Sequence, residues 1–346
     1  MCIRDRTYVV ADACGNTTAG IVHTISVDDT TDPVIAAPND ISIEACKADD
    51  TSVTAGNAGF AYSEAEVTLT SGDVTTFLDL AGASITEDCA YTVTYSDSQD
   101  DTCPVLVTRT YVIVDACGNS TNDIQTITVD DTTDPVIAAP ADISISACTA
   151  DATTVTAVNA GFAYSETSVT LESADVITFL DLAGASITEA CDYTVTYIDI
   201  QTAAEMCGIL VTRAYTITDA CGNDSSDNQI ITVEDTTDPT LDDPSGLPSS
   251  FSQDLASTEC NFNYFVEIPD ASDNCDDDLS VTLTATDVNN NVLTVQLINN
   301  DGTAAVTLPL GVNTLTLTLV DDCMNDVTHS WTVTLIDNIA PQISCP

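Results

Sequence analysis

A five-residue sequence, Asp-Ala-Cys-Gly-Asn, occurs three times in this chain, at residues 12–16, 115–119 and 219–223. Each copy is followed by a similar run that ends in an acidic junction of the type Asp-Asp-Thr-Thr-Asp-Pro. The valines that open these junctions, Val27, Val129 and Val233, lie 102 and 104 residues apart. This period is too long for a solenoid repeat and suits one small β-sandwich per repeat. We therefore expect a tandem array of domains.

The period divides the sequence into five predicted segments. The first is the C-terminal remnant of a preceding repeat, because Arg6 and Tyr8 match Arg109 and Tyr111. Two closely similar repeats and a divergent one follow, and the last residues begin a further repeat. The predicted limits are 1–30, 31–133, 134–237, 238–340 and 341–346. We accordingly expect a fragment of a longer protein.

The composition is strongly acidic, with 55 Asp and Glu against 5 Lys and Arg and a formal net charge of −50. Hydrophobic residues still make up 44% of the chain, which favours a folded protein over a disordered one. A field of this sign repels nucleic acid and attracts divalent cations. Because no run of about twenty apolar residues is present, we predict no membrane span in this fragment.

Fourteen cysteines recur at matching places in the repeats and never in a Cys-x-x-Cys pair. This pattern favours disulfides over zinc or redox chemistry. Disulfides persist in oxidising compartments, so the chain is expected to be extracellular, either secreted or at a cell surface.

Short runs rich in Val, Thr, Ile and Tyr alternate in polarity, most clearly at residues 91–95 and 124–129. These runs predict strands with one buried face. Gly118 and Asn119 tolerate positive φ and predict the hairpin turn between the last two strands of the repeat. The stretch that starts at Phe77 is predicted to contain a helical turn. The fold class is therefore all-β.

The closing run of the fourth repeat, residues 308–325, resembles the hyalin-repeat (HYR) family, together with Trp331 to Leu335 and residues 337–346. The Asp-Ala-Cys-Gly-Asn turns and Asp-Thr-Thr-Asp-Pro junctions share the resemblance. It covers the last third of each repeat well and the first half poorly, since residues 53–86 and 155–188 look expanded. The resemblance implies tandem immunoglobulin-like β-sandwich domains, stapled by disulfides, as in large secreted or cell-surface adhesins.

In a sandwich of this kind the strand directions place the cysteines at two ends. Cys89 and Cys117 fall at the end where the chain enters the repeat, and Cys46 and Cys103 at the far end. We therefore predict disulfides within each repeat. The predicted pairs are Cys89–Cys117, Cys46–Cys103, Cys191–Cys221, Cys148–Cys207 and Cys275–Cys323. Cys260 has no evident partner.

The acidic junctions are candidate calcium sites, because they lie next to the turns and loops at the entry end of the following repeat. Six to eight oxygens of this kind suit Ca²⁺ better than Mg²⁺. The alternative is a solvated turn whose aspartates cap backbone amides. The candidate ligands are Asp28, Asp29, Asp32, Glu87, Asp88, Asp115, Asn119, Asp130, Asp131, Asp134, Glu189, Asp192, Asp219, Asn223, Glu234, Asp235 and Asp238. The acidic run 273–278 is a second candidate.

Arg6, Arg109 and Arg213 recur at one strand position in a chain almost without bases. They predict structural ion pairs with carboxylates. No nucleophile elbow, phosphate loop or paired histidine motif is present, so no enzymatic activity is predicted.

The sequence therefore predicts an extracellular structural or adhesive stalk segment, a spacer made of neighbouring repeats and stiffened by calcium at the junctions. One alternative is a carbohydrate- or protein-binding module in the divergent fourth repeat, which would take a surface glycan or a protein as ligand. Exposed aromatic side chains around Phe262, Tyr264 and Phe265 would favour it. Another alternative is the non-catalytic part of a secreted hydrolase.

Overall fold

The computed structural model describes residues 2–100, 102–202, 207–242, 247–256, 260–298 and 303–340. The predicted start of a further repeat at 341–346 lies outside these residues. Most of the regular structure is strand, with four short helices in the described part, so the all-β prediction is confirmed. The first two strands, β1 (Cys2–Tyr8) and β2 (Ile21–Val27), form an antiparallel hairpin that pairs Arg6 with His23.

The second repeat is built on a five-stranded sheet in the order β4-β9-β8-β7-β5. Its strands are β4 (Ile41–Glu44), β5 (Val67–Thr68), β7 (Tyr91–Gln99), β8 (Val105–Asp115) and β9 (Ser120–Asp130). Alternate residues of β8 are buried, as the period of a strand with one core face requires. The edge strand β4 runs parallel to β9, so both strands end at the exit end of the repeat.

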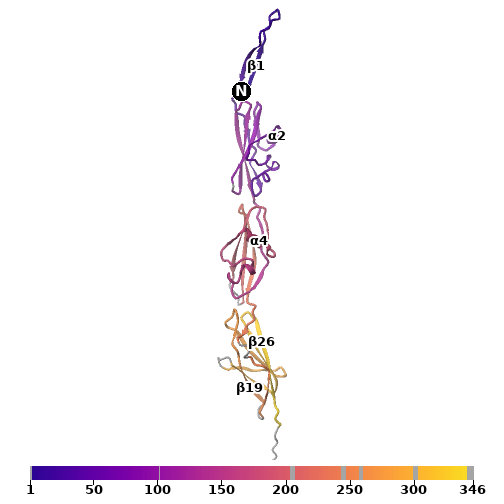
Figure 1. The fold of residues 1–346 in the computed structure, drawn as a ribbon, viewed down its shortest axis with the longest axis vertical. Helices are drawn as coiled ribbons and strands as arrows, with labels where there is room; N and C mark the ends of the chain where they lie inside the picture. The colour runs from indigo at the N-terminus through magenta and orange to yellow at the C-terminus, as the bar shows by residue number, and fades with distance from the viewer. Residues whose placement is uncertain are drawn as a thin grey trace, which may run out of the picture. The chain divides into compact units, whose positions relative to one another are not determined.

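Opposite this sheet lies a thin second layer. It contains the two-stranded sheet of β3 (Val34–Ala36) and β6 (Ser84–Thr86) and the helices α1 (Ala55–Ala58) and α2 (Ser71–Asp79). Figure 1 labels α2 beside the long strands. Phe77 of α2 is fully buried and packs with Val93, Tyr111 and Ile113 of the large sheet. The expanded segment thus supplies helices where a sandwich would have more strands.

Helix α2 begins at the N-cap Thr70, whose hydroxyl accepts a hydrogen bond from the backbone nitrogen of Asp73. The Asp73 carboxylate in turn accepts from the Thr70 backbone nitrogen at 2.9 Å. Such a reciprocal box satisfies two backbone donors that the first helical turn leaves without partners. The helical turn predicted from Phe77 onward therefore starts earlier in the chain and ends at Asp79.

The third repeat has the same arrangement. Its sheet follows the order β11-β16-β15-β14-β12, and β10 pairs with β13. The strands are β10 (Val136–Ala138), β11 (Ile143–Ser146), β12 (Val169–Leu171), β13 (Ser186–Thr188), β14 (Tyr193–Gln201), β15 (Gly208–Asp219) and β16 (Asp224–Glu234). Its helices are α3 (Ala157–Ala160) and α4 (Ser173–Asp181).

The fourth repeat has more strands, as its sequence indicates. The order β18-β26-β25-β21-β22 forms one sheet and β19-β24-β23 another, while β17 pairs with β20. These strands are β17 (Thr240–Leu241), β18 (Phe251–Asp254), β19 (Asn261–Glu267), β20 (Ala271–Ser272), β21 (Ser280–Thr286), β22 (Val292–Leu293), β23 (Val295–Ile298), β24 (Thr303–Pro309), β25 (Gly311–Val320) and β26 (Asp326–Ile336). Trp331 is buried in the core between them with Leu308, Leu315 and Val333.

The recurring arginine of the second repeat is fully buried in the core. Arg109 lies opposite Asp97 across β7 and β8, and two of its nitrogens donate to the two Asp97 carboxylate oxygens at 2.7 and 2.8 Å. Its other donors reach the carbonyl oxygens of Ala58, Phe60 and Ala61. The guanidinium also lies 4.8 Å from the ring centre of Tyr95. The predicted ion pair is confirmed.

Arg213 and Asp199 repeat this pairing in the third repeat, again at 2.7 and 2.8 Å. All donors of a buried guanidinium need acceptors, because an unpartnered charge in the core costs several kcal/mol. In both repeats the carbonyl acceptors lie at the end of α1 or α3 and in the loop that follows it. The arginine therefore attaches the expanded segment to the large sheet.

The chain forms two compact units, and the boundary between them passes through the third repeat. The first unit contains Met1–Ile137 together with Ile187–Val195 and Thr216–Ser226. The second contains Ala138–Ser186, Thr196–Tyr215 and Asp227–Pro346. The entry-end loops of the third repeat thus cluster with the second repeat. The limits of the individual repeats stay predictions.

Candidate functional site at the repeat junctions

The Asp-Ala-Cys-Gly-Asn sequence forms a tight turn closed by its own aspartate. One carboxylate oxygen of Asp115 accepts from the backbone nitrogens of Cys117 and Asn119 at 2.8 and 2.9 Å. The other accepts from the Asn119 side-chain nitrogen at 2.8 Å. Gly118 has φ +95°, a left-handed conformation that glycine adopts without the usual steric cost. The predicted hairpin turn is confirmed.

These hydrogen bonds control the ionisation of the turn aspartates. Burial is the largest single influence and acts to raise the pKa of Asp115. The bonds from Asn119, Cys117 and Gly118 together outweigh it, so the pKa lies below the ordinary value of 3.8. The pKa of Asp219 is lowered in the same way, with burial opposed by bonds from Asn223 and Cys221. Both aspartates are charged, and both oxygens of each are engaged within the turn.

The asparagine of each turn also reaches the junction that precedes its repeat. The side-chain nitrogen of Asn119 donates to the backbone carbonyl oxygen of Asp29 at 2.8 Å. Asn223 does the same to Asp131 at 2.7 Å, and Asn325 to Asp235 at 3.2 Å. The turn therefore presents an amide N–H group to the junction, where the calcium hypothesis requires an oxygen.

Glu44 is a junction residue that the sequence reasoning missed. Its carboxylate accepts from the backbone nitrogen of Thr132 at 2.7 Å and from the hydroxyls of Thr132 and Thr133 at 3.0 and 3.2 Å. In the third repeat Ser146 takes this place and bonds the Thr236 hydroxyl at 2.8 Å. The parallel pairing of β4 with β9 brings Glu44 next to Asp130, and this pairing is the signal that could have identified it.

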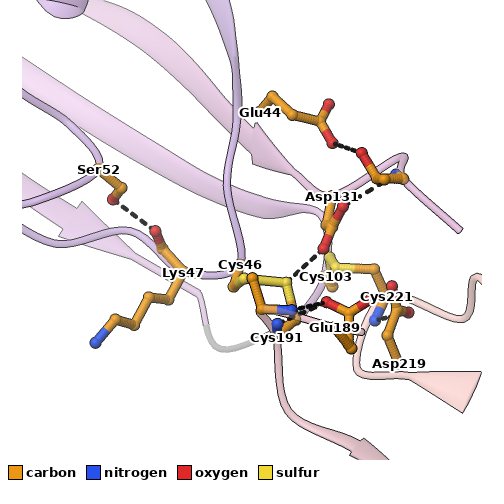
Figure 2. The surroundings of a disulfide bond; sticks show 12 residues. Glu44, Cys46, Lys47, Ser52, Cys103, Asp131, Glu189, Cys191, Asp219 and Cys221 are labelled. Atoms are coloured by element: carbon orange, nitrogen blue, oxygen red, sulfur yellow. Dashed lines mark hydrogen bonds between the residues drawn. A yellow bond between two sulfur atoms is a disulfide. The ribbon is translucent and has the colours of Figure 1, made fainter. Parts of the chain in front are cut away.

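Three disulfides are present in the described residues, and each joins two consecutive repeats. Cys46 bonds Cys191 and Cys103 bonds Cys221, both between the second and third repeats. Cys148 bonds Cys275 between the third and fourth. The Cα atoms of the pairs are 5.2, 4.9 and 5.1 Å apart, within the usual range. Figure 2 shows the first bond, with Asp131 and Glu189 pointing toward it.

The prediction of disulfides within each repeat was therefore wrong for Cys46, Cys103, Cys148, Cys191, Cys221 and Cys275. The predicted ends of the sandwich agree with the bonds that form: exit-end Cys46 and Cys103 bond entry-end cysteines. The partner, however, belongs to the next repeat. Cys89 carries a free thiol and forms no disulfide with Cys117, and Cys148 and Cys275 bond each other, which excludes Cys148–Cys207 and Cys275–Cys323.

The backbone of the junction explains why two disulfides fit there. Asp130 and Asp131 are consecutive residues in an extended stretch, so their side chains point to opposite sides. A carboxylate oxygen of Asp130 lies 3.5 Å from the Cys103 sulfur, and a carboxylate oxygen of Asp131 lies against the Cys191 sulfur. One disulfide thus lies on each side of the junction. Strand directions within a single repeat do not reveal these neighbours, because the second cysteine of each bond comes from the following repeat.

The surroundings of Asp131 disfavour the charged form of its carboxylate. The bond from the Thr133 backbone acts to lower its pKa, but burial, Glu44 and the charges of Glu189 and Asp219 together raise it above the ordinary 3.8. At the preceding junction the bond from the Thr31 backbone and that from the Cys89 thiol lower the pKa of Asp29. The Cys89 thiol donates to Asp29 at 3.3 Å, and this bond is the main cause that raises the pKa of Cys89 to about 11.

The structure brings together only part of the predicted calcium ligands. Among the described residues, carboxylate oxygens gather with cysteine sulfurs in four places: Asp29 and Glu87 near Cys89, Asp131 at Cys46–Cys191, Asp130 at Cys103–Cys221, and Asp235 and Asp273 near Cys275. Sulfurs in a disulfide carry no charge for a metal, and Asp115 and Asp219 are engaged in their turns. The remaining predicted carboxylate ligands belong to none of these groups: Asp28, Asp32, Asp88, Asp134, Glu189, Asp192, Glu234 and Asp238. Asn119 and Asn223 donate their side-chain N–H groups to junction carbonyls.

The junction between the third and fourth repeats differs from the others. Asp235 is 7% exposed, and one of its carboxylate oxygens has no hydrogen-bond partner in the described part of the chain; the same holds for one oxygen of Asp273. The other oxygen of Asp273 caps the backbone nitrogens of Cys275 and Asp276 at 2.8 and 3.2 Å. The acidic run 273–278 thus contributes both a turn cap and an unpartnered oxygen.

No helix in the described residues combines the length and apolar character needed to cross a membrane. No family model and no curated protein matches the chain. Solved structures with similarity include PcdhgB3 EC1-4, with a TM-score of 0.29 and 10% identity over 98% of this chain and 83% of that one.

Protocadherin Gamma B7 extracellular cadherin domains 1-4 has a TM-score of 0.28 and 14% identity over 96% and 83% of the two chains. The titin Ig tandem A164-A165 has a TM-score of 0.20 and 8% identity, covering 59% of this chain and 97% of that one. At these values the likenesses assign no function, ligand or partner to this chain.

Proposed function

We propose that the chain is a non-catalytic structural segment of an extracellular or cell-surface protein, in which consecutive repeats are joined covalently to bear load. The observation that carries the proposal is the pair of disulfides, Cys46–Cys191 and Cys103–Cys221, on the two sides of one junction. Disulfides of this kind persist outside the reducing cytosol. The net charge of −50 also favours solubility at the surface of a cell.

Under tension these bonds change the path that the force takes. A pull on both ends passes from Cys46 through the disulfide to Cys191 and leaves residues 47–147 unloaded. In the same way Cys148–Cys275 leaves residues 192–274 unloaded, and residues 148–191 carry the force between the two bonds. The disulfides thus limit the distance between consecutive repeats even when their sheets unfold. In the loop-entropy model each such long closed loop also adds about 5 kcal/mol of stability.

Single-molecule stretching tests the proposal. The oxidised chain, held by both termini, is expected to extend to less than half the contour of the reduced chain, since an unfolded residue adds about 3.5 Å. The matched control is Cys46→Ser with Cys191→Ser, which returns the second repeat to the force path and lengthens the oxidised contour. An oxidised chain as long as the reduced one would show that the bonds bear no load and would overturn the proposal.

Calcium binding is a second part of the proposal, and the third–fourth junction supports it best. A carboxylate oxygen of Asp235 and one of Asp273 lie within 4.8 Å of each other, and Asp235 is nearly buried. Each residue also has an oxygen without a hydrogen-bond partner in the described residues. Two like charges at this distance repel unless a cation lies between them. Ca²⁺ accepts such carboxylates and completes its shell with water and carbonyl oxygens.

Isothermal titration of the oxidised chain with CaCl₂ measures this site directly. We expect one bound ion whose affinity falls at least tenfold in Asp235→Asn with Asp273→Asn. The control is Asp130→Asn, which alters a junction carboxylate that lies beside a disulfide. Unchanged binding in the double variant would reject the site and leave the covalent proposal standing.

One observation favours the binding alternative in the fourth repeat. Phe265 on β19 is 60% exposed and borders a shallow hollow with Asn263 and Gln296, an aromatic and amide lining that suits a sugar ring. Phe262 and Tyr264 pack against the core instead. A panel of immobilised oligosaccharides tests this: binding that is lost in Phe265→Ala but kept in Phe251→Ala would establish the module, and no binding would reject it.

A further inference from the structure

Cys207 and Cys323 occupy positions that correspond to a bonded pair at the previous junction. Cys207 precedes β15 as Cys103 precedes β8, and both strands continue with Val-Thr-Arg. Cys323 stands in the turn Asp321 to Asn325 as Cys221 stands in Asp219 to Asn223. Cys103 and Cys221 form a disulfide, whereas Cys207 and Cys323 carry thiols in the structure.

The two thiols are already close to each other. The Cys207 sulfur donates to the backbone carbonyl oxygen of Asp322, the residue before Cys323, at 2.8 Å. Both cysteines line one cavity of about 160 Å³ together with the Cys148–Cys275 disulfide. Burial, followed by a hydrogen bond with Cys207, raises the pKa of Cys323 to about 12. The Cys207 sulfur thus lies within hydrogen-bond reach of both Cys323 and the residue before it.

We propose that Cys207 and Cys323 form a fourth disulfide, so that the third–fourth junction has two covalent links like the second–third junction. The oxidant is a small-molecule disulfide such as oxidised glutathione. One thiolate attacks it, forms a mixed disulfide and expels one glutathione thiolate. The second cysteine thiolate then attacks the protein sulfur of that mixed disulfide and releases the second glutathione. Two electrons and two protons leave the cysteine pair, and two thiols of glutathione are formed.

The proposed bond is independent of the load-bearing role, because the three disulfides that carry that role are present whether or not Cys207 and Cys323 are joined. Its failure would leave Cys46–Cys191 and the stretching result untouched. Conversely, an oxidised contour shortened only by the interval between Cys207 and Cys323 would reject the load-bearing role of the other bonds and support this one, whereas a contour equal to the reduced one would reject both.

Thiol counting on the full chain tests the proposal, after incubation with a glutathione redox buffer, denaturation and titration with a chromogenic disulfide. If the bond forms, Cys207→Ser releases the Cys323 thiol, so the count rises by one relative to the parent chain. If both thiols are free, the same substitution removes one, and the count falls by one. The matched control is Cys103→Ser, which must raise the count by one because Cys221 loses its partner.

Peptide mapping identifies the partner. The oxidised chain is alkylated and digested with pepsin at low pH, where disulfides do not exchange, and its fragments are analysed by mass spectrometry. The expected product is one peptide that contains Cys207 joined to Cys323, which separates on reduction. Recovery of both cysteines as alkylated peptides, or of Cys207 joined to the exposed Cys260, would overturn the proposal.

Discussion

Asn119 donates its side-chain amide to the backbone carbonyl oxygen of Asp29, 90 residues earlier in the chain, at 2.8 Å. The same amide also donates to Asp115, so one side chain closes the turn and attaches it to the junction. The turn that marks the repeat in the sequence is therefore a connector in the structure.

Asn119→Ala removes both bonds, and each ordinary hydrogen bond contributes about 1 kcal/mol. We expect a loss of about 1 to 2 kcal/mol, measured by chemical denaturation of the oxidised chain. Asn291→Ala is the matched control, since Asn291 donates to Asp287 at 2.8 Å in a similar turn, between β21 and β22 of the fourth repeat. Equal losses in the two variants would show that the junction bond contributes nothing.

Met324 has φ +69° at the position that Gly118 and Gly222 occupy in the other turns. A left-handed conformation costs a residue with a Cβ about 1 kcal/mol, so Met324→Gly is expected to stabilise the fourth repeat by up to that amount. Gly118→Ala is the reverse test and should destabilise by about 1 kcal/mol. A Cβ at Gly118 meets no atom within 4 Å, so only backbone strain is measured. A thermal melt in which both variants shift in the same direction would contradict this explanation.

Arg109→Met leaves the Asp97 carboxylate buried without its partner. Breaking a buried ion pair in this way costs about 3 to 5 kcal/mol, and we expect the second repeat to lose most of its stability. Arg109→Lys keeps the charge but cannot reproduce the two parallel bonds to Asp97 or reach all three carbonyls, so it should be intermediate. Equilibrium denaturation ranks the two, and a Met variant as stable as the parent would show that the pair is dispensable.

The opposite pKa shifts of Asp219 and Asp131 predict opposite effects of pH on the stability of the fold. The pKa of Asp219 is lowered in the folded state, so its charged form stabilises the fold at pH values above the ordinary pKa of 3.8. This stabilisation is lost as the pH falls through the pKa of the folded state. Asp131 has a raised pKa, so its charged form destabilises the fold at neutral pH, and protonation relieves this as pH falls through the raised value. We expect Asp219→Asn to lower the melting temperature at pH 7 and Asp131→Asn to raise it.

Both differences should vanish well below pH 3.8, where the parent carboxylates are protonated as well. Melting curves between pH 2 and 7 measure them. Asp142→Asn is a control, because within the described residues this carboxylate accepts one hydrogen bond, from the backbone nitrogen of Ile230. A stabilising Asp219→Asn, or a destabilising Asp131→Asn at pH 7, would contradict the expected pH dependences.

Local patterns predicted the parts of this protein that depend on nearby residues. Alternation in 91–95 identified β7, and glycine with asparagine identified the turn. A lone arginine at a strand position implied a carboxylate partner, and Asp97 lies directly opposite Arg109. The start of α2 was placed too late because its capping box, Thr70 and Asp73, precedes the apolar residues.

Alternation and turn residues were sufficient to predict the long strands, the hairpin turn and the ends of the sandwich at which Cys46, Cys89, Cys103 and Cys117 lie, because a period of two and positive-φ residues act within one strand or loop. The bond between Cys46 and Cys191, and the engagement of the Asp115 oxygens within their own turn, are visible only in the folded chain. Disulfide partners depend on which ends of two repeats meet, and hydrogen-bond partners on the path of the backbone. Neither is encoded in the spacing of residues along one repeat.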